Sequence, residues 1–326
     1  MLRILTYHRI AELTDSPSLD PRSISATPAS FALQMQHLAR YYHVVSMTDV
    51  LQAVEQQTPL PKRSVLITFD DAYIDFADNA WPILRQWRLP ATLFVPTAQA
   101  SDPGRAFWWD RLYQAFVGTS RTECVETPLG PLSLAASEER QRGLRALQNH
   151  VKTLPHAEAM RLVDDVCARL GGITTYSRSV LGWDQLRRLK GEGLTLGSHT
   201  RTHTILTQLP PEQIRSEISG SQQDLKREIG SVLPIFCYPN GGHDDVTTAI
   251  LRDEGIVLAF TTLAGNNELG TTDLLRLRRT DIRPRTSLVV FRLRLLGPAA
   301  YVDAWRQRTR KAELSQQVSP RQATVA

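Results

Sequence analysis

The residues of this chain best suited to chemistry are two adjacent carboxylates, Asp70 and Asp71, which directly follow an apolar, β-branched run at residues 64–69. That run has the length and composition of a buried strand. Desolvating a carboxylate is costly unless its charge is paired or bound to a metal. The pair therefore needs a partner where the strand ends, and we expect that partner to be a divalent metal ion.

Two histidines spaced four residues apart, His199 and His203, would supply the remaining ligands of such an ion. On one helical turn this spacing places both imidazoles on the same side. Two ring nitrogens and one carboxylate oxygen then bind one face of the metal and leave positions open for water and substrate. Zn²⁺ is the first expectation, with Co²⁺, Fe²⁺ and Mn²⁺ as alternatives. If Asp71 ligates the ion, Asp70 is free to act as the base that deprotonates an attacking water.

Parallel strands would bring these residues together. Strand-like runs alternate with helical segments, which indicates a parallel sheet with right-handed crossovers. About seven such units favour a closed or nearly closed barrel, with an open doubly wound sheet as the alternative. Both folds place ligands at the carboxyl ends of their strands. The features that directly follow a predicted strand are His8, Asp70, Asp71, His199 and the turn at residues 238–242.

Further residues around this face are candidates for binding substrate. In the turn, the backbone N–H of Asn240 could donate to a developing oxyanion, or the segment could be a plain tight turn. Trp108 and Trp109 could stack on sugar rings or be buried in packing. They lie in a less regular region, about residues 101–180, which we interpret as a helical insertion covering one mouth of the domain, although ordinary packing helices would also explain it.

The motifs Thr68-Phe69-Asp70-Asp71 and Ser198-His199-Thr200-Arg201-Thr202-His203 resemble those of the polysaccharide deacetylase family, the metal-dependent carbohydrate esterases that include chitooligosaccharide deacetylase-like enzymes. The likeness extends over residues 2–285 and includes Tyr7-His8 and the turn with Tyr238 and Pro239, which we expect to contact substrate. It implies a distorted (β/α) barrel that hydrolyses N-acetyl groups on amino sugars. It also implies Asp70 as base and Asp71, His199 and His203 as metal ligands. The Phe107-Trp108-Trp109-Asp110 segment resembles members tied to bacterial exopolysaccharide synthesis.

The chain departs from the family pattern in two places. Many members have an arginine and a tyrosine in the third motif, where this chain has Cys237 and Asn240, so the arginine that would orient the base is expected to be missing. No Leu-x-His occurs late in the chain, where the family carries its general-acid histidine; the corresponding segment is residues 276–282. His8 and His243 are candidates for this acid, which the sequence leaves unassigned.

Composition and charge limit the remaining function classes. The 326 residues are 42% hydrophobic and 22% charged, which is ordinary for a globular protein and excludes a fibrous or disordered body. Three widely spaced cysteines form no disulfide framework, which favours a reducing compartment, and we expect a cytoplasmic protein. No secretory signal and no apolar run of about 18 residues is visible.

Basic residues concentrate at the C-terminus. Residues 276–326 contain twelve Lys or Arg and three acids, whereas the chain as a whole has a net charge of +5. This basic extension favours an anionic neighbour, with a solvated tail as the alternative. Residues 287–296 mix arginines with apolar side chains and could lie on an anionic membrane or pack on the barrel. We expect no nucleic-acid partner, a catalytic domain at residues 1–305 and a disordered tail at 306–326.

These observations favour a metal-dependent hydrolase that removes N-acetyl groups from an oligo- or polysaccharide, an exopolysaccharide or its precursor. Two other functions stay open. The same site could hydrolyse a non-sugar amide. Alternatively, the missing acid and the basic C-terminus could mark a catalytically impaired module that binds glycan or membrane. The oligomeric state is not determined by the sequence.

Overall fold

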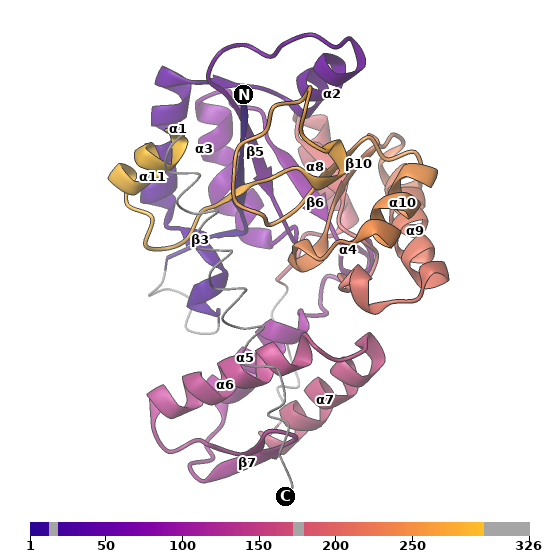
Figure 1. The fold of residues 1–326 in the computed structure, drawn as a ribbon. Coiled ribbons are helices and arrows are strands. Elements are labelled where there is room, and N and C mark those ends of the chain that lie inside the picture. Colours follow the sequence, from indigo (N-terminus) through magenta and orange to yellow (C-terminus); the bar gives the residue numbers. More distant parts are fainter. Residues whose placement is uncertain (13–18, 172–178, 297–326) are drawn as a thin grey trace, which may run out of the picture.

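The computed structural model describes residues 1–12, 19–171 and 179–296. The strands of its central sheet are β1 (Leu2–Tyr7), β4 (His43–Val44), β5 (Ser64–Phe69), β6 (Thr92–Val95), β9 (Thr195–Ser198), β10 (Ile235–Cys237), β11 (Leu258–Phe260) and β12 (Thr280–Asp281). They lie in the order β11-β10-β9-β6-β5-β1-β12, with β4 paired to β5 beside this path, and every pair is parallel. The sheet curves among the helices (Figure 1). The expected distorted (β/α) barrel of about seven parallel strands is thus confirmed.

One short segment joins the two edges of this sheet. The backbone N–H of Leu277 donates to the Ala259 carbonyl at 2.9 Å, and the N–H of Thr261 donates to the Leu277 carbonyl at 2.9 Å. Three residues later β12 pairs with β1, where Thr6 lies opposite Asp281. Residues 277–281 therefore touch both edges and nearly close the barrel.

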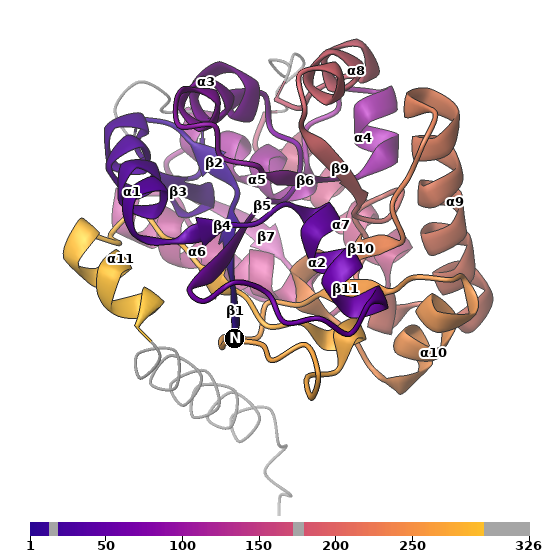
Figure 2. The same cartoon turned by 90° about the horizontal axis from the view of Figure 1, so that it is seen from above.

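The strand β5 occupies an interior position of the sheet. All of its residues are buried, because the sheet has helices on its outer face and a packed interior on the other. A strand covered on both faces is expected to be a continuous apolar run rather than an alternating pattern. Figure 2 shows the surrounding helices from above.

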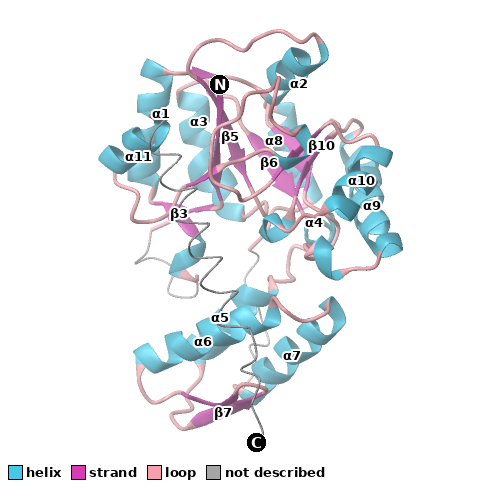
Figure 3. Cartoon of the chain, viewed as in Figure 1, coloured by secondary structure: helices cyan, strands magenta, loops and turns pink. Residues whose placement is uncertain are grey.

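Helices follow most of the strands and form the outer layer (Figure 3). Thr27 caps the first of them, where its hydroxyl accepts from the Ser30 N–H and Pro28 occupies the first turn. The α-helices of the barrel are α1 (Pro28–Tyr41), α2 (Met47–Glu55), α3 (Trp81–Gln86), α4 (Thr97–Ser101), α8 (Trp183–Gly191), α9 (Pro211–Ile229), α10 (Asp245–Asp253) and α11 (Leu288–Leu295). Short elements are β2 (Arg9–Ile10), β3 (Ile24–Ala26), η1 (Pro21–Ser23), the π-helix η2 (Phe76–Ala80), η3 (Leu206–Gln208), η4 (Pro239–Gly241) and η5 (Leu274–Arg276).

The expected helical insertion forms a separate layer at one end of the barrel (Figure 1). It contains α5 (Trp108–Gly118), the antiparallel hairpin of β7 (Cys124–Thr127) and β8 (Gly130–Ser133), α6 (Ser137–Val151) and α7 (His156–Arg169). The hairpin was not predicted. These elements share their own apolar core, which includes Leu112, Phe116, Leu147, Val163 and Val166. The insertion is therefore stabilised by its own side chains, and it contacts the barrel at the start of α5, at Gln148 of α6 and at Lys152.

The C-terminal part of the described chain is α11. Phe291 and Leu295 pack into the barrel core, whereas Val289 and Leu293 are 65% and 51% exposed. Within the described ranges, no helix has both the length and the apolar character needed to cross a lipid bilayer. The predicted domain end at residue 305 and the tail at 306–326 lie outside the described residues.

Candidate active site

Three side chains from two strand ends converge as the sequence predicts. Asp71 follows β5, and His199 and His203 follow β9. The Asp71 Oδ1 atom lies 3.5 Å from His199 Nε2 and 3.1 Å from His203 Nε2. Asp71 and His199 are buried, and one ligand atom from each of the three residues lies within 4.8 Å of the others. A carboxylate oxygen and two imidazole nitrogens at this spacing fit the donor set of Zn²⁺, Co²⁺, Fe²⁺ or Mn²⁺.

The two histidines do not lie on a helical turn, and that expectation is wrong. Residues 199–205 form a loop in which Thr200 and His203 have φ angles of 64° and 56°. Left-handed backbone at non-glycine residues is uncommon and persists only where surrounding contacts hold it. Here Glu217 Oε2 accepts from the N–H groups of Arg201 and Thr202 at 2.8 and 3.0 Å. The loop, rather than helical periodicity, places the two rings 4.8 Å apart.

The protonation of the two rings differs. Burial lowers the pKa of His203, which favours the neutral imidazole that a metal requires. Burial also lowers the pKa of His199, but neighbouring Cys237 and Asp71 outweigh it, and the net pKa is well above its usual value.

Asp70, the candidate base, is held by an arginine. Arg279 Nη1 donates to Asp70 Oδ1 at 2.8 Å and Arg279 Nη2 donates to Asp70 Oδ2 at 2.7 Å, and both side chains are buried. Arg279 Nε also donates to the Thr261 carbonyl at 2.8 Å. Burial raises the pKa of Asp70, but the charge and hydrogen bonds of Arg279 outweigh burial and leave the pKa below its usual value. The carboxylate is thus ionised at neutral pH.

The prediction that the arginine beside the base is missing is therefore wrong. Cys237 occupies the motif position where the arginine was sought, and Arg279 reaches Asp70 from the segment between β11 and β12. The two residues are 209 positions apart, so no local pattern connects them. In the run Arg276-Leu277-Arg278-Arg279, residue type does not distinguish Arg279 from the two arginines before it, so the sequence gives no signal for this contact.

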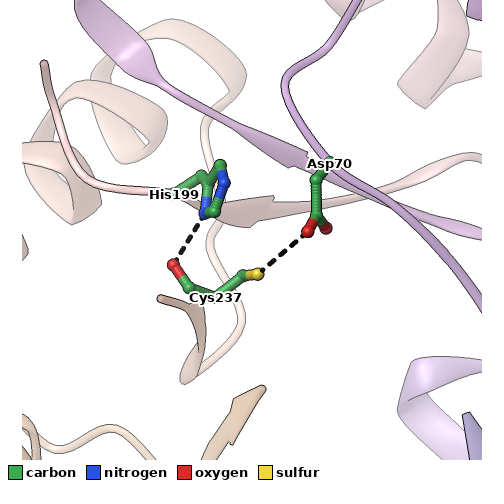
Figure 4. Close-up of side chains that lie close together, drawn as sticks. All are labelled: Asp70, His199 and Cys237. Atoms are coloured by element: carbon green, nitrogen blue, oxygen red, sulfur yellow. Dashed lines mark hydrogen bonds between the residues drawn. The ribbon is translucent and has the colours of Figure 1, made fainter. Parts of the chain in front are cut away.

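A second group of possible ligand atoms comprises Asp70, His199 and Cys237 (Figure 4). Cys237 Sγ donates to Asp70 Oδ2 at 3.5 Å, and His199 Nδ1 lies 2.7 Å from the Cys237 carbonyl oxygen. Both oxygens of Asp70 already accept from Arg279, and burial raises the pKa of the Cys237 thiol. This group therefore fits a cation poorly. The Cys237 carbonyl instead orients His199, whose Nε2 atom is directed at Asp71.

Of the two candidate acids, His8 lies on the side of the carboxylates. It follows β1 directly, is half-buried, and its charge contributes to lowering the pKa of both Asp70 and Asp71. His243 instead lies 2.7 Å through its Nδ1 from the Gly241 carbonyl oxygen and packs against Tyr238. The structure therefore favours His8 over His243 as the neighbour of the base.

The turn after β10 has the irregular backbone expected there. Asn240 is exposed and has a φ of 56°, and Gly241 has a φ of 70°. A Cβ on Gly241 would approach Thr262 Oγ1 to 2.1 Å, so only glycine fits. The Tyr238 side chain is buried and its hydroxyl donates to the Leu275 carbonyl at 2.8 Å, and Pro239 is also buried. Their contact with substrate, and the oxyanion role of Asn240, stay predictions.

The tryptophans at the start of the insertion face different surroundings. Trp108 packs on the core of the insertion, whereas Trp109 packs on the core of the barrel. Trp109 Nε1 donates to the Tyr73 hydroxyl at 2.9 Å, and its ring centroid lies 4.8 Å from that of His203. Both tryptophans are half-buried, and their binding of sugar stays a prediction.

A buried arginine that sequence reasoning did not single out links the insertion to the barrel. Arg9 Nη1 lies 3.0 Å from Asp75 Oδ2, and Arg9 Nη2 lies 3.0 Å from Asp110 Oδ2. Its guanidinium carbon lies 3.5 Å from the centroid of the Tyr73 ring. The signal was the charge of Arg9 directly after His8, in a segment otherwise rich in buried apolar residues.

The chain is similar to several known proteins. A family model described as polysaccharide deacetylase matches residues 57–259. A Staphylococcus epidermidis poly-β-1,6-N-acetyl-D-glucosamine N-deacetylase is 33% identical over 101 residues, which is 28% of this chain and 35% of that protein. A protein of the same name from Staphylococcus aureus is 27% identical over 106 residues, or 30% and 37% of the two chains. The aligned part is about a third of the length of these curated relatives.

Two solved structures share the fold. The Streptococcus pyogenes deacetylase PplD, in complex with acetate, superposes with a TM-score of 0.62 at 21% identity and covers 90% of this chain and 98% of that one. IcaB from Ammonifex degensii has a TM-score of 0.58 at 20% identity, with 90% and 97% covered. At these identities the likeness establishes the arrangement of strands and helices.

Proposed function

Because the chain belongs to the polysaccharide deacetylase family, we propose that it is a metal-dependent hydrolase that removes N-acetyl groups from amino sugars of a bacterial exopolysaccharide or its precursor. The observation that carries this proposal is the meeting of Asp71, His199 and His203 beside a second carboxylate, Asp70, which Arg279 holds ionised. A site for a cation and a base adjacent to it are the two parts that amide hydrolysis requires.

Asp71, His199 and His203 would hold the ion, which we propose to be Zn²⁺, with Co²⁺, Fe²⁺ or Mn²⁺ as alternatives. When bound, the ion would supply Lewis acidity that makes a water molecule more acidic and polarises the amide carbonyl. The buried carboxylate and the hydrogen bond between His199 Nδ1 and the Cys237 carbonyl keep the ligand atoms oriented in advance.

Asp70 would take the proton from the water whose oxygen attacks the acetamide carbonyl carbon. The exposed turn at Asn240 would direct a backbone N–H at the oxygen of the tetrahedral intermediate. The bond between carbon and nitrogen then breaks, and His8 would give a proton to the departing amine. The products are acetate and the protonated amine of the sugar, and the proton that Asp70 took from the water would return to His8 through solvent, so atoms and charge balance.

The relatives support a poly-β-1,6-N-acetylglucosamine type of substrate, because two of them are named as deacetylases of that polymer. We propose that this chain acts on an N-acetylated polymer of the same class, with Trp108, Trp109, Tyr238 and Pro239 as candidate contacts. The alternative of a catalytically impaired module that binds glycan or membrane is favoured by the basic C-terminus and by the absence of the family's late histidine, whereas the pairing of Asp70 with Arg279 favours an active site. No observation in the described residues favours a non-sugar amide.

We also propose that α11 rests on an anionic lipid surface. Three of its side chains, Val289, Val290 and Leu293, are apolar and exposed, while its charged residues, Arg292 and Arg294, are basic. Apolar side chains beside arginines are typical of helices that lie in the interface of anionic membranes. A cytoplasmic location, expected from the cysteines, stays a prediction.

The proposed reaction is tested by measuring metal content and acetate release from N-acetylglucosamine oligomers with the same full-length preparation. A chelator should abolish acetate release, and one equivalent of Zn²⁺ should restore it. Asp70→Asn should abolish release while the metal content stays at one ion per chain. Asp184→Asn, which alters an exposed carboxylate on α8, serves as the matched control. Full activity of Asp70→Asn would refute the base assignment.

The proton donor is tested in the same assay. His8→Gln should lower kcat by about 10²- to 10⁴-fold, the usual contribution of a general acid, with metal content unchanged. His243→Gln should have a much smaller effect, because that ring is bonded to its own turn. Equal losses in the two variants would reject His8 as the specific donor. In the same assay, release of acetate from simple acetamides but not from sugar oligomers would favour the alternative in which this site hydrolyses a non-sugar amide.

A further inference from the structure

The two histidines of the proposed metal site are held in different ways. His199 Nδ1 lies 2.7 Å from the Cys237 carbonyl oxygen, so a hydrogen bond fixes the orientation of its ring. His203 Nδ1 is buried and has no hydrogen-bond partner in the part of the chain that the structure describes. Histidines that bind metals almost always donate through the second nitrogen to a fixed acceptor. The ring of His203 therefore needs another means of support.

Aromatic side chains of the insertion supply that support. The Trp109 ring meets the His203 ring in an edge-on contact, with centroids 4.8 Å apart and an interplanar angle of 62°. Phe107 makes a similar contact at 5.5 Å and 65°. Phe107 and Trp109 are themselves stacked at 4.4 Å with nearly parallel planes. Edge-on ring pairs at these distances have a preferred geometry, so they restrict rotation of the smaller ring.

Trp109 is in turn fixed to the barrel. Its Nε1 donates to the Tyr73 hydroxyl at 2.9 Å, and the Arg9 guanidinium lies over the Tyr73 ring at 3.5 Å. Arg9 also binds Asp110, the residue after Trp109, through Nη2 at 3.0 Å. The start of α5 is therefore attached to the barrel through both Trp109 and Asp110.

We propose that Trp109 is the positioning residue for His203, so that the insertion completes the metal site of the barrel. The inference rests on the proposed function only in that His203 is taken as a ligand. It gives the insertion a role besides covering one end of the barrel: without the Trp109 ring, His203 turns about its χ angles and its Nε2 leaves the position opposite Asp71 Oδ1.

The test is the affinity for metal, measured with the full-length chain by competition between the protein and a chromophoric chelator for Zn²⁺. Trp109→Leu should weaken binding by about 10- to 100-fold, the range found when partners that orient a ligand are removed. Trp109→Phe, which keeps a ring but not the bond to Tyr73, should weaken it less. With Co²⁺ in place of Zn²⁺, the visible absorption bands of Trp109→Leu should shift, because the coordination geometry changes.

Trp183→Leu is the matched control. Trp183 is also half-buried on the barrel core and also donates through Nε1, to Ser101 Oγ at 2.9 Å. Trp183→Leu should lower the thermal stability of the metal-free chain, measured by unfolding in chelator, about as much as Trp109→Leu does. It should keep the Zn²⁺ affinity of the parent. If Trp109→Leu binds Zn²⁺ as tightly as the parent, or Trp183→Leu binds as weakly as Trp109→Leu, the inference is wrong. If the parent itself binds no Zn²⁺, the proposed function fails before this inference is reached.

Discussion

Asp70 is both buried and paired with Arg279, and these two properties shift its pKa in opposite directions. A buried carboxylate without a partner would have a raised pKa, and it would be protonated too often to serve as a base. The bidentate bond from Arg279 reverses that effect and keeps Asp70 ionised, at the expense of some basicity. Its two oxygens also accept two parallel N–H groups, which fixes the plane of the carboxylate toward the metal site. Arg279 therefore sets both the charge and the direction of the proposed base.

Arg279→Lys tests this assignment, because it keeps the positive charge and removes the paired hydrogen bonds. We expect the pKa of Asp70 to rise, because burial is then opposed by a weaker interaction. The acid limb of the kcat/KM profile, where activity falls as Asp70 becomes protonated, should therefore move to higher pH. Stability at neutral pH should also fall, since the buried Asp70 charge is less well compensated.

The control for this variant is Arg278→Lys, the adjacent residue, whose guanidinium is directed at the Ala264 carbonyl rather than at Asp70. Its acid limb should match the parent. An unchanged acid limb in Arg279→Lys would show that Arg279 does not control the ionisation of Asp70. pH profiles between 4 and 9, with unfolding followed by circular dichroism, measure both effects.

At the scale of elements, strands were easier to predict than the loops that follow them. The run at β5 is apolar throughout because the strand is covered on both faces, and this composition is visible in the sequence. The loop that carries His203 depends on left-handed backbone at Thr200 and His203, which neither residue type signals. The site residues could be predicted because they follow strands, whereas the local geometry that brings them together could not.

The insertion is attached to the barrel by a buried acid with an unusual titration. Burial raises the pKa of Asp110 to about 6, even though Arg9 opposes the shift. The unfolded chain should have a value of about 3.9. Between about pH 4 and 6 the folded state therefore holds a proton that the unfolded state has lost, so ionisation of Asp110 costs stability as the pH rises. The contribution of protonated Asp110 to the unfolding free energy is complete below about pH 4 and lost above about pH 6.

Asp110→Asn should remove this dependence. A difference of about two pKa units corresponds to about 3 kcal/mol, so the parent should lose about that much unfolding free energy, relative to the variant, between pH 4 and pH 7. Urea unfolding at several pH values measures the difference. Asp165→Asn, an exposed acid on α7, is the control and should follow the parent. Parallel curves for parent and Asp110→Asn would contradict the assigned shift.

At the scale of the whole molecule, the barrel explains both what the sequence predicted and what it did not. Parallel strands all present their carboxyl ends on one side, so the order of strands and polar residues was enough to predict a shared site. Arg279 reaches Asp70 across the seam where residues 277–281 join the two edges of the sheet. The strand β12 is only two residues long, too short for a period of hydrophobicity, so this seam has no sequence signature.

On the outside of the molecule, α11 has exposed apolar side chains. A helix that is apolar on its outward face as well as its inward face is normally buried. On α11, Phe291 and Leu295 face the barrel, yet Val289, Val290 and Leu293 are exposed. The neighbouring helix α1 adds the exposed Leu33 and Tyr41, and α1 and α11 lie side by side in both cartoon views (Figures 1 and 2). We call these five exposed apolar residues the α1–α11 face.

An anionic membrane fits the α1–α11 face better than a neutral partner, because α11 contains two arginines and no acid. Val289→Ser/Leu293→Ser should lower binding of the full-length chain to phosphatidylglycerol vesicles by several-fold, because each substitution removes apolar area from the interface. Substitution is preferable to truncation before α11, since truncation would also expose the core that Phe291 and Leu295 cover.

Val117→Ser/Val246→Ser, at exposed valines of the insertion and α10, is the control and should bind as the parent does. Co-sedimentation with anionic and with neutral vesicles measures the effect. Equal binding to both vesicle types would show that a neutral surface covers α11. A parent chain that forms dimers, which the Val289→Ser/Leu293→Ser variant loses, would show that another copy of the chain covers it.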